Sequence, residues 1–216
     1  MKLNQFLVVI DPTSKDSQPS LERAAWVAKR SKSAIELLIC EYNSALDGGF
    51  FFDGPAQQKA RESLLNNLSL WLDKLAQPLR DDGLTVTTEV RWGKPLHSMV
   101  LQRIDELKPD LVFRDATTHS LLQRLFFNNT SWQLIRQCPV PLWLVRKGEW
   151  KAERICAALD PVHSADTEAV LDHLLVASTA HLAKTLGMQA DYMHSYAPLP
   201  RTMVFDSELV AAYDQY

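Results

Sequence analysis

Short apolar runs alternate with longer amphipathic segments over residues 6–146. Phe6–Ile10 is apolar and largely β-branched, which is typical of a strand buried on both faces. The following segment, Leu21–Ala28, repeats apolar residues at helical spacing, and Ser17 or Ser20 is expected to cap that helix. The chain is therefore expected to open with a buried strand followed by an amphipathic helix.

The same alternation continues through four more strands and three more helices. The strands are expected at Ala34–Tyr42, Thr85–Trp92, Asp110–Phe113 and Val140–Val145, and the helices at Ala56–Asp82, Pro95–Leu107 and Thr130–Gln137. Strands that alternate with helices indicate a parallel sheet covered by helices on both faces. The sequence thus predicts an α/β fold with a doubly wound five-stranded parallel sheet.

The opening phrase of the chain recurs about 150 residues later, which is one ordinary domain length. Val8–Pro12, an apolar run closed by Asp-Pro, returns as Ala157–Pro161. The repeated strand, helix and strand, and the start of a further helix, are expected at Arg154–Leu159, Ala165–Leu186, Gln189–Tyr196 and Ser207–Tyr216. We therefore expect a complete domain at residues 1–148 and an incomplete second copy at 149–216.

Composition and charge narrow the classes of partner. The chain is 46% hydrophobic and 23% charged, which is ordinary for a globular protein. A formal charge of −3 offers no overall attraction to nucleic acid or anionic lipid, and Phe6–Ile10 is too short to span a membrane. Cys40, Cys138 and Cys156 are too widely spaced for a Cys-x-x-Cys motif and are expected to be reduced thiols. We expect a cytoplasmic protein without a nucleic-acid or membrane partner.

Four phrases, in order and at domain spacing, resemble the universal stress protein family. Leu7–Asp11 resembles the first strand of that family, and Val90–Pro95 resembles its third strand with the Gly-x-Pro turn that follows. Pro109–Val112 resembles its fourth strand, and Gln137–Arg146 resembles its final strand. This resemblance implies the adenine nucleotide alpha-hydrolase-like fold of that family, and the second copy implies its tandem type.

The resemblance also locates the position at which members of the family bind ATP. Those members carry Gly-x-x-Gly, nine residues, and then Gly-Ser or Gly-Thr, between the fourth strand and the fourth helix. Glycines there allow the backbone to approach phosphate closely. Aligned on the final strand, the glycine positions fall at Asp115, Thr118 and Asn128, and the hydroxyl position at Asn129. ATP is therefore not the expected cofactor, although Asp11 is retained.

A polar crevice is still expected where the strands end. In a doubly wound sheet, ligands favour the carboxyl ends of the strands near the point where strand order reverses. Asp11 follows the first strand, and Arg114 and Asp115 close the fourth. Arg114 is then either an anion contact or the partner of Asp11 in an internal ion pair; the ion pair is the favoured interpretation. Asn128 and Asn129 present helix amides to an anion or simply cap the helix.

The remaining motifs give no support for catalysis. The sequence contains no Gly-x-Ser-x-Gly, Walker or His-Glu-x-x-His motif, so no catalytic or metal-ligating residue is assigned. We expect a non-enzymatic stress-response protein that acts through protein partners or an unidentified small ligand. The alternatives are an ATP-binding or ATP-hydrolysing switch and a carrier of an apolar molecule that uses Phe50–Phe52. Family members pair through their fifth strands, so a homodimer, or pairing between modules, is expected through Pro141–Arg146.

Overall fold

The computed structural model of the protein describes residues 2–14, 18–47, 54–116, 130–160 and 169–195. The chain divides into two compact units, Met1–Trp150 and Lys151–Tyr216. The predictions that concern Ser17, Phe50–Phe52, Asn128, Asn129 and Ser207–Tyr216 lie outside the described residues.

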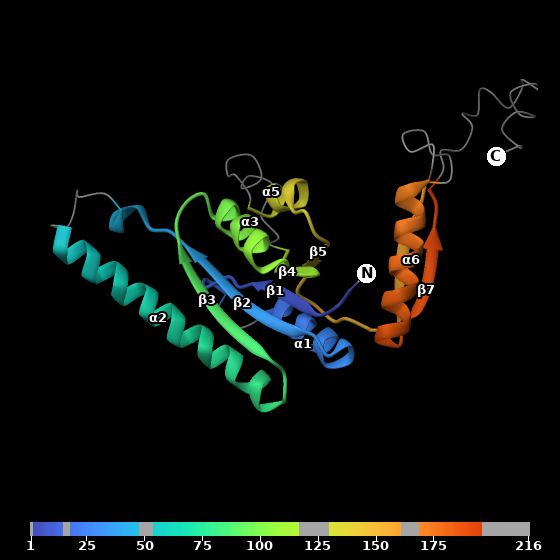
Figure 1. Cartoon of the computed structure of the whole chain (residues 1–216), viewed down its shortest axis with the longest axis horizontal. Coiled ribbons are helices and arrows are strands. Elements are labelled where there is room, and N and C mark those ends of the chain that lie inside the picture. The colour runs from blue at the N-terminus through green and yellow to red at the C-terminus, as the bar shows by residue number, and fades with distance from the viewer. Residues whose placement is uncertain (1, 15–17, 48–53, 117–129, 161–168, 196–216) are drawn as a thin grey trace, which may run out of the picture. The chain divides into compact units, whose positions relative to one another are not determined.

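Five parallel strands form the sheet of the first unit (Figure 1). They are β1 (Gln5–Val9), β2 (Ala34–Glu41), β3 (Val86–Trp92), β4 (Leu111–Asp115) and β5 (Leu142–Val145). Their spatial order is β3-β2-β1-β4-β5, so the direction of winding reverses between β1 and β4. The predicted doubly wound α/β fold is confirmed, and β3 and β5 are its edge strands.

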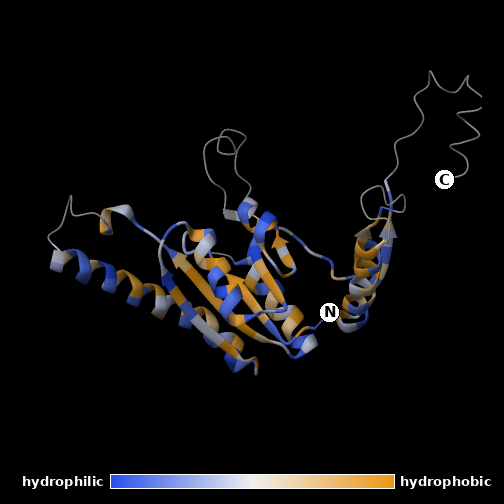
Figure 2. Cartoon of the chain, turned by 45° about the horizontal axis from the view of Figure 1, so that its top comes forward, coloured by the Kyte–Doolittle hydropathy of each residue, from blue (hydrophilic) through white to orange (hydrophobic). Residues whose placement is uncertain are grey.

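Helices cover both faces of this sheet (Figure 1). They are α1 (Pro19–Ser31), α2 (Gly54–Asp81), α3 (Leu96–Leu107) and α5 (Thr130–Gln137), with a short 3-10 turn η1 at Ser44–Leu46. Successive side chains of a strand point to opposite faces, so Leu7 and Val9 pack toward α3 and α5, whereas Phe6 and Val8 face the other layer. Figure 2 shows the resulting apolar strands between more polar helices.

Both layers of the core are closely packed. On the α3 and α5 side, Leu38 and Val112 join Ile104 and Leu134 in one buried cluster. On the opposite side, the rings of Phe6 and Phe113 meet edge to face, with their centroids 5.4 Å apart. Phe113 also stacks on Trp143 of β5, with 5.3 Å between the ring centroids. The aromatic contacts extend the core to the β5 edge.

One buried charge interrupts the apolar layer between the sheet and α3. Glu36 lies in β2 and is only 3% exposed. Both of its carboxylate oxygens accept hydrogen bonds from Arg103 of α3, at 2.7 Å from Nε and 2.6 Å from Nη2. Arg103 also donates to Glu106, which is bound in turn by Arg91 of β3. This charge network ties α3 to two neighbouring strands.

The second unit contains a two-stranded parallel sheet and one helix in its described part. β6 (Arg154–Ala158) pairs with β7 (Gln189–Met193), and α6 (Val170–Leu186) connects them. Arg154 and Asp191 form an ion pair between the strands, with 2.8 Å between Nε and Oδ2. That this unit is an incomplete copy of the first remains a prediction. None of the helices in the described ranges is long and apolar enough to cross a membrane.

The buried ion pair predicts a large effect of a small substitution. Glu36→Gln replaces one carboxylate oxygen by an N–H donor that faces the donors of Arg103. We expect the free energy of unfolding of the first unit to fall by about 2 kcal/mol or more, because a hydrogen-bonded charge is lost away from water. Urea titration followed by tryptophan fluorescence measures this. Asp105→Asn is the control, since Asp105 pairs with Lys108 at the surface and its loss should cost at most about 0.5 kcal/mol. Equal losses in both variants would contradict the argument.

The same network predicts an acid-dependent stability. Hydrogen bonds from Arg91 and Arg103 lower the pKa of Glu106 from 4.5 to about 2. A carboxylate with a lowered pKa stabilises the fold above its unfolded-state pKa, and this contribution disappears as the pH falls to the folded-state value. The advantage of the natural chain over Glu106→Gln should therefore decrease between pH 4.5 and about 2. Unfolding titrations across this range test it, and a difference that persists to the acid end would argue against the network.

Candidate functional site

A crevice lies at the carboxyl ends of β1 and β4, where the order of strands reverses. Its volume is about 230 Å³. The residues that line it come from the ends of β1, β2 and β4 and from the first turns of α3: Val9, Ile10, Asp11, Pro12, Thr13, Cys40, Leu96, Val100, Arg114 and Asp115. Three of the predicted site residues, Asp11, Arg114 and Asp115, thus meet in one cavity. The other two, Asn128 and Asn129, lie outside the described residues.

Arg114 and Asp115 have different roles because they are neighbours in one strand. Successive strand residues point to opposite faces of a sheet. Arg114 lies opposite Val9 in the pairing of β4 with β1, and its Nε donates to Ser131 Oγ of α5 at 3.3 Å. Asp115 instead accepts from α1, on the other face. The Arg114 side chain therefore lies on the α5 side of the sheet, and the Asp115 side chain binds α1 on the other side.

Asp11 is engaged with its own turn. Its Oδ1 accepts from the backbone N–H of Thr13 at 2.9 Å and from the Thr13 hydroxyl at 2.7 Å. Among the described residues, no ion pair joins Asp11 to Arg114, so the favoured prediction of such a pair is wrong. The Asx-type turn after β1 satisfies the carboxylate locally, which leaves it near Arg114 without direct contact.

The position of Arg114 makes the crevice suitable for a small anion. Burial lowers the pKa of its guanidinium, while the charge of Asp11 opposes that shift. A partly desolvated guanidinium that is not neutralised by a contacting carboxylate attracts an anion more strongly than an exposed one does. Its planar fork is also suited to two-point contact with a carboxylate or phosphate. The crevice can therefore recognise a small polar ligand that carries negative charge.

Asp115 acts as a cap for α1. Its Oδ1 accepts the backbone N–H of Ser20 at 2.6 Å, and burial raises the pKa of its carboxyl. The helix begins at Pro19, preceded by Gln18, whose side chain makes no capping bond to the helix. Ser20 therefore lies inside the first turn, and the prediction that it caps the helix is wrong. A carboxylate from β4 replaces the local cap.

The thiol in the crevice is not poised for chemistry. Burial raises the pKa of Cys40 to about 12, although the charges of Arg91 and Arg114 oppose the shift. The thiolate is the reactive form of cysteine, so Cys40 stays a protonated, inert group at neutral pH. All three cysteines are free of disulfides. In the described part of the chain, no group of three or more His, Cys, Asp or Glu side chains is placed to hold a metal ion.

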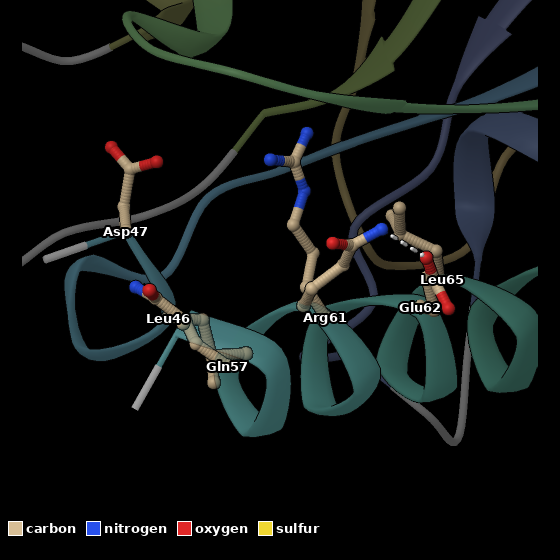
Figure 3. A pocket seen from close by; sticks show the side chains of 8 residues that line it. Leu46, Asp47, Gln57, Arg61, Glu62 and Leu65 are labelled. Carbon is tan, nitrogen blue, oxygen red and sulfur yellow. Dashed lines mark hydrogen bonds between the residues drawn. The ribbon is translucent and has the colours of Figure 1, made fainter. Parts of the chain in front are cut away.

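A second cavity, of about 450 Å³, opens beside the start of α2 (Figure 3). Leu46, Asp47, Gly54, Gln57, Gln58, Arg61, Glu62 and Leu65 line it. Charged and amide groups contribute much of this lining, and Gln58 is hydrogen-bonded to Glu62 at 2.9 Å. An apolar ligand would have to desolvate these groups without replacing their contacts with water. The cavity therefore gives no support to the interpretation of an apolar carrier.

Some residues of the crevice carry no clear signal in the sequence. Thr13, Cys40 and Ser131 contact or line the site, yet none belongs to a recognisable motif. Only the position of Thr13 next to Asp-Pro could have indicated an Asx-type turn. Cys40 and Ser131 are brought to the crevice by the pairing of β2 with β1 and by the packing of α5.

Comparison with known proteins gives consistent matches. A model described as "Universal stress protein family" matches residues 2–146. Curated relatives named Universal stress protein E, from Escherichia coli (strain K12) and Salmonella typhi, are each 26% identical over 180 residues, which is 83% of this chain. The chain spans 57% of the length of these relatives. The sequence motifs of residues 7–146 also resemble universal stress protein E more than other members of the family. The matches to these relatives confirm that resemblance.

Solved structures agree on the fold. A functionally unknown protein from Pseudomonas aeruginosa PAO1 superimposes with a TM-score of 0.68 at 22% identity, over 99% of this chain and 66% of that one. Universal stress protein UspA from Lactobacillus plantarum gives a TM-score of 0.54 at 16% identity, over 68% of this chain and 99% of that one. At these identities the likeness is one of architecture. The family model matches well over half of the sequence, and the chain therefore belongs to the universal stress protein family.

Proposed function

We propose that this protein is a non-enzymatic stress-response protein of the tandem universal stress type, whose crevice binds a small anionic ligand and whose β5 edge binds a protein partner. The observation that carries the ligand proposal is Arg114, which lines the crevice and lacks an ion-pair partner among the described residues. The ligand class follows from the charge and the planar donor geometry of this side chain.

Two observations favour a ligand smaller than ATP. Positions 115, 118 and 128 hold Asp, Thr and Asn where the ATP-binding members of the family have glycine. Asp115 adds negative charge near the site and is already occupied as the cap of α1. The crevice volume of about 230 Å³ is also below the range of roughly 300–1,000 Å³ that is usual for drug-sized ligands. A triphosphate would meet both electrostatic and steric resistance.

The proposal of a non-enzymatic role rests on the chemistry of the same crevice. Its thiol is held protonated, and Asp11 is occupied by the turn at Thr13. Among the described residues that line the crevice, Thr13 carries the one hydroxyl, and its bond to Asp11 belongs to the same Asx-type turn, so we assign it a structural role. The three free thiols are compatible with the reducing cytoplasm, where we propose that the protein acts.

The proposed partner surface is the outer edge of β5, over Pro141–Arg146. β5 pairs only with β4 within the described sheet, so its other edge carries backbone groups that a further strand can bind. A second copy of the chain or the second module of a tandem protein are the proposed occupants. Because the relatives are longer than this chain, both assignments are proposals for the protein as a whole.

Native and denaturing mass spectrometry of the purified chain, with and without ATP, tests both parts. We expect no ATP adduct, a dimer mass, and a small anion that is released on denaturation. Arg114→Met should abolish retention of the anion because it removes the charge while keeping an unbranched side chain. Arg136→Met is the control, since Arg136 is an exposed arginine of α5.

Stoichiometric retention of ATP would instead favour the ATP-binding switch. A monomer that retains no anion would overturn both the ligand and the partner proposal.

A pair of substitutions at Asp115 tests its assignment as a cap. Asp115→Ala removes the acceptor for the Ser20 amide and should lower the free energy of unfolding by about 1 kcal/mol. Asp115→Asn keeps an acceptor oxygen and removes the buried charge. Because burial raises the pKa of Asp115 above 3.8, its ionised form costs stability as the pH rises through that value. At neutral pH the Asn variant should therefore equal or exceed the natural chain, and this advantage should disappear in acid. Equal destabilisation by Asn and Ala would contradict the assignment.

A further inference from the structure

A third cavity lies on the flank of α1 beside the end of β5 and shares no lining residue with the crevice. Its volume is about 410 Å³, and its lining comes from two segments. Four lining residues lie in α1 at the i, i+3, i+4 and i+7 spacing of one helix face: Pro19, Glu22, Arg23 and Trp26. The other four follow β5 in the chain: Arg146, Lys147, Gly148 and Trp150. The first unit therefore builds this cavity from residues more than a hundred positions apart.

Arg23 is the central group of this cavity. Its guanidinium carbon lies 3.2 Å from the centroid of the Trp150 ring and 6.0 Å from that of Trp143. Stacking of this kind holds the face of the guanidinium and leaves its N–H edges available. Within the described residues, those edges make no hydrogen bond or ion pair. Burial also lowers the pKa of Arg23, with the nearby charge of Glu22 opposing the shift. The geometry thus presents a fixed fork of donors without an acceptor.

The tryptophan rings hold this arginine in place and leave little aromatic surface for a ligand. Trp26 and Trp150 meet edge to face, with 4.7 Å between their centroids. Arg30 covers Trp26 at 3.7 Å, as Arg23 covers Trp150. Guanidinium groups therefore occupy ring faces that would otherwise stack on a planar ligand. Recognition in this cavity must come mainly from its charged donors.

Positive charge is concentrated here in a protein that is acidic overall. Arg23, Arg146 and Lys147 line the cavity, against the single carboxylate of Glu22, whereas the whole chain carries a formal charge of −3. Three cations around one space favour a ligand with at least two negative charges. A fixed arginine fork and a flexible lysine are also the usual combination for phosphate oxygens.

We propose that this cavity is a second ligand site of the protein, which binds a small soluble molecule through a phosphate group carrying two or more negative charges. The volume of about 410 Å³ lies within the range of roughly 300–1,000 Å³ that is common for small-molecule sites. The site is independent of the ligand proposed for the crevice at Arg114.

Inorganic pyrophosphate is a suitable first probe, titrated into the intact chain while tryptophan fluorescence is recorded. Binding should change the emission, and the change should be lost in Trp150→Phe. Arg23→Met keeps an apolar side chain over Trp150 and removes the fork, so the affinity should fall by about tenfold or more. Arg23→Lys should bind more weakly than the natural chain but better than Arg23→Met. Raising the salt concentration should weaken binding in the natural chain.

Two control variants separate this site from other sources of charge. Lys74→Met removes an exposed cation from α2 and should leave the affinity unchanged. In Arg114→Met, which removes the anion-binding arginine of the crevice, the part of the fluorescence change that depends on Trp150 should persist. Loss of binding in Arg114→Met but not in Arg23→Met would place the anion in the crevice and overturn the proposal. The proposal would also be overturned if millimolar pyrophosphate did not bind. The same holds if Arg23→Met lowered the thermal stability but left the affinity for pyrophosphate unchanged.

Discussion

Burial of the central strands on both faces is the constraint from which the rest of the first unit follows. Residues Phe6–Ile10 are each at most 4% exposed, so a polar side chain at any of these positions would need a buried partner. The first polar residue after this strand is Asp11, and in β4 the apolar run likewise gives way to Arg114 and Asp115. Because the strands are parallel, these polar ends meet at one edge of the sheet. The crevice is thus a consequence of the way the core is built.

Glu36 shows the cost of departing from that constraint. A carboxylate in the interior of β2 is compatible with the fold only because Arg103 reaches it with two hydrogen bonds from α3. That requirement fixes the rotation of α3 about its axis as well as its distance from the sheet. The apolar residues Val100 and Ile104 on the same helix are then directed into the core beside Leu38. Polar and apolar contacts therefore specify the same helix position, which favours a single packed arrangement.

Local patterns in the sequence predict the strands and helices, and their alternation indicates the doubly wound class of fold. The place of the crevice follows from a general property of that class, in which ligands bind where the strand order reverses. Contacts between distant segments were not predictable in this way. The bond from Ser20 to Asp115 joins residues 95 positions apart, and no nearby residue signals it. The predicted ion pair between Asp11 and Arg114 does not form, because Thr13 donates hydrogen bonds to the Asp11 carboxylate in a local turn. Arg23 and Trp150 are likewise ordinary residues until α1 packs beside the end of β5.

The contact between Trp150 and α1 also has a mechanical consequence. Trp150 is the last residue of the first unit, and β5, only a few positions before it, is a strand of 4 residues. Tension applied to the chain beyond Trp150 reaches its stack on Arg23 and Trp26 before it reaches the hydrogen bonds of β5. Along the chain, the aromatic stack is therefore the first contact of this unit to bear such tension, ahead of the four-residue strand β5.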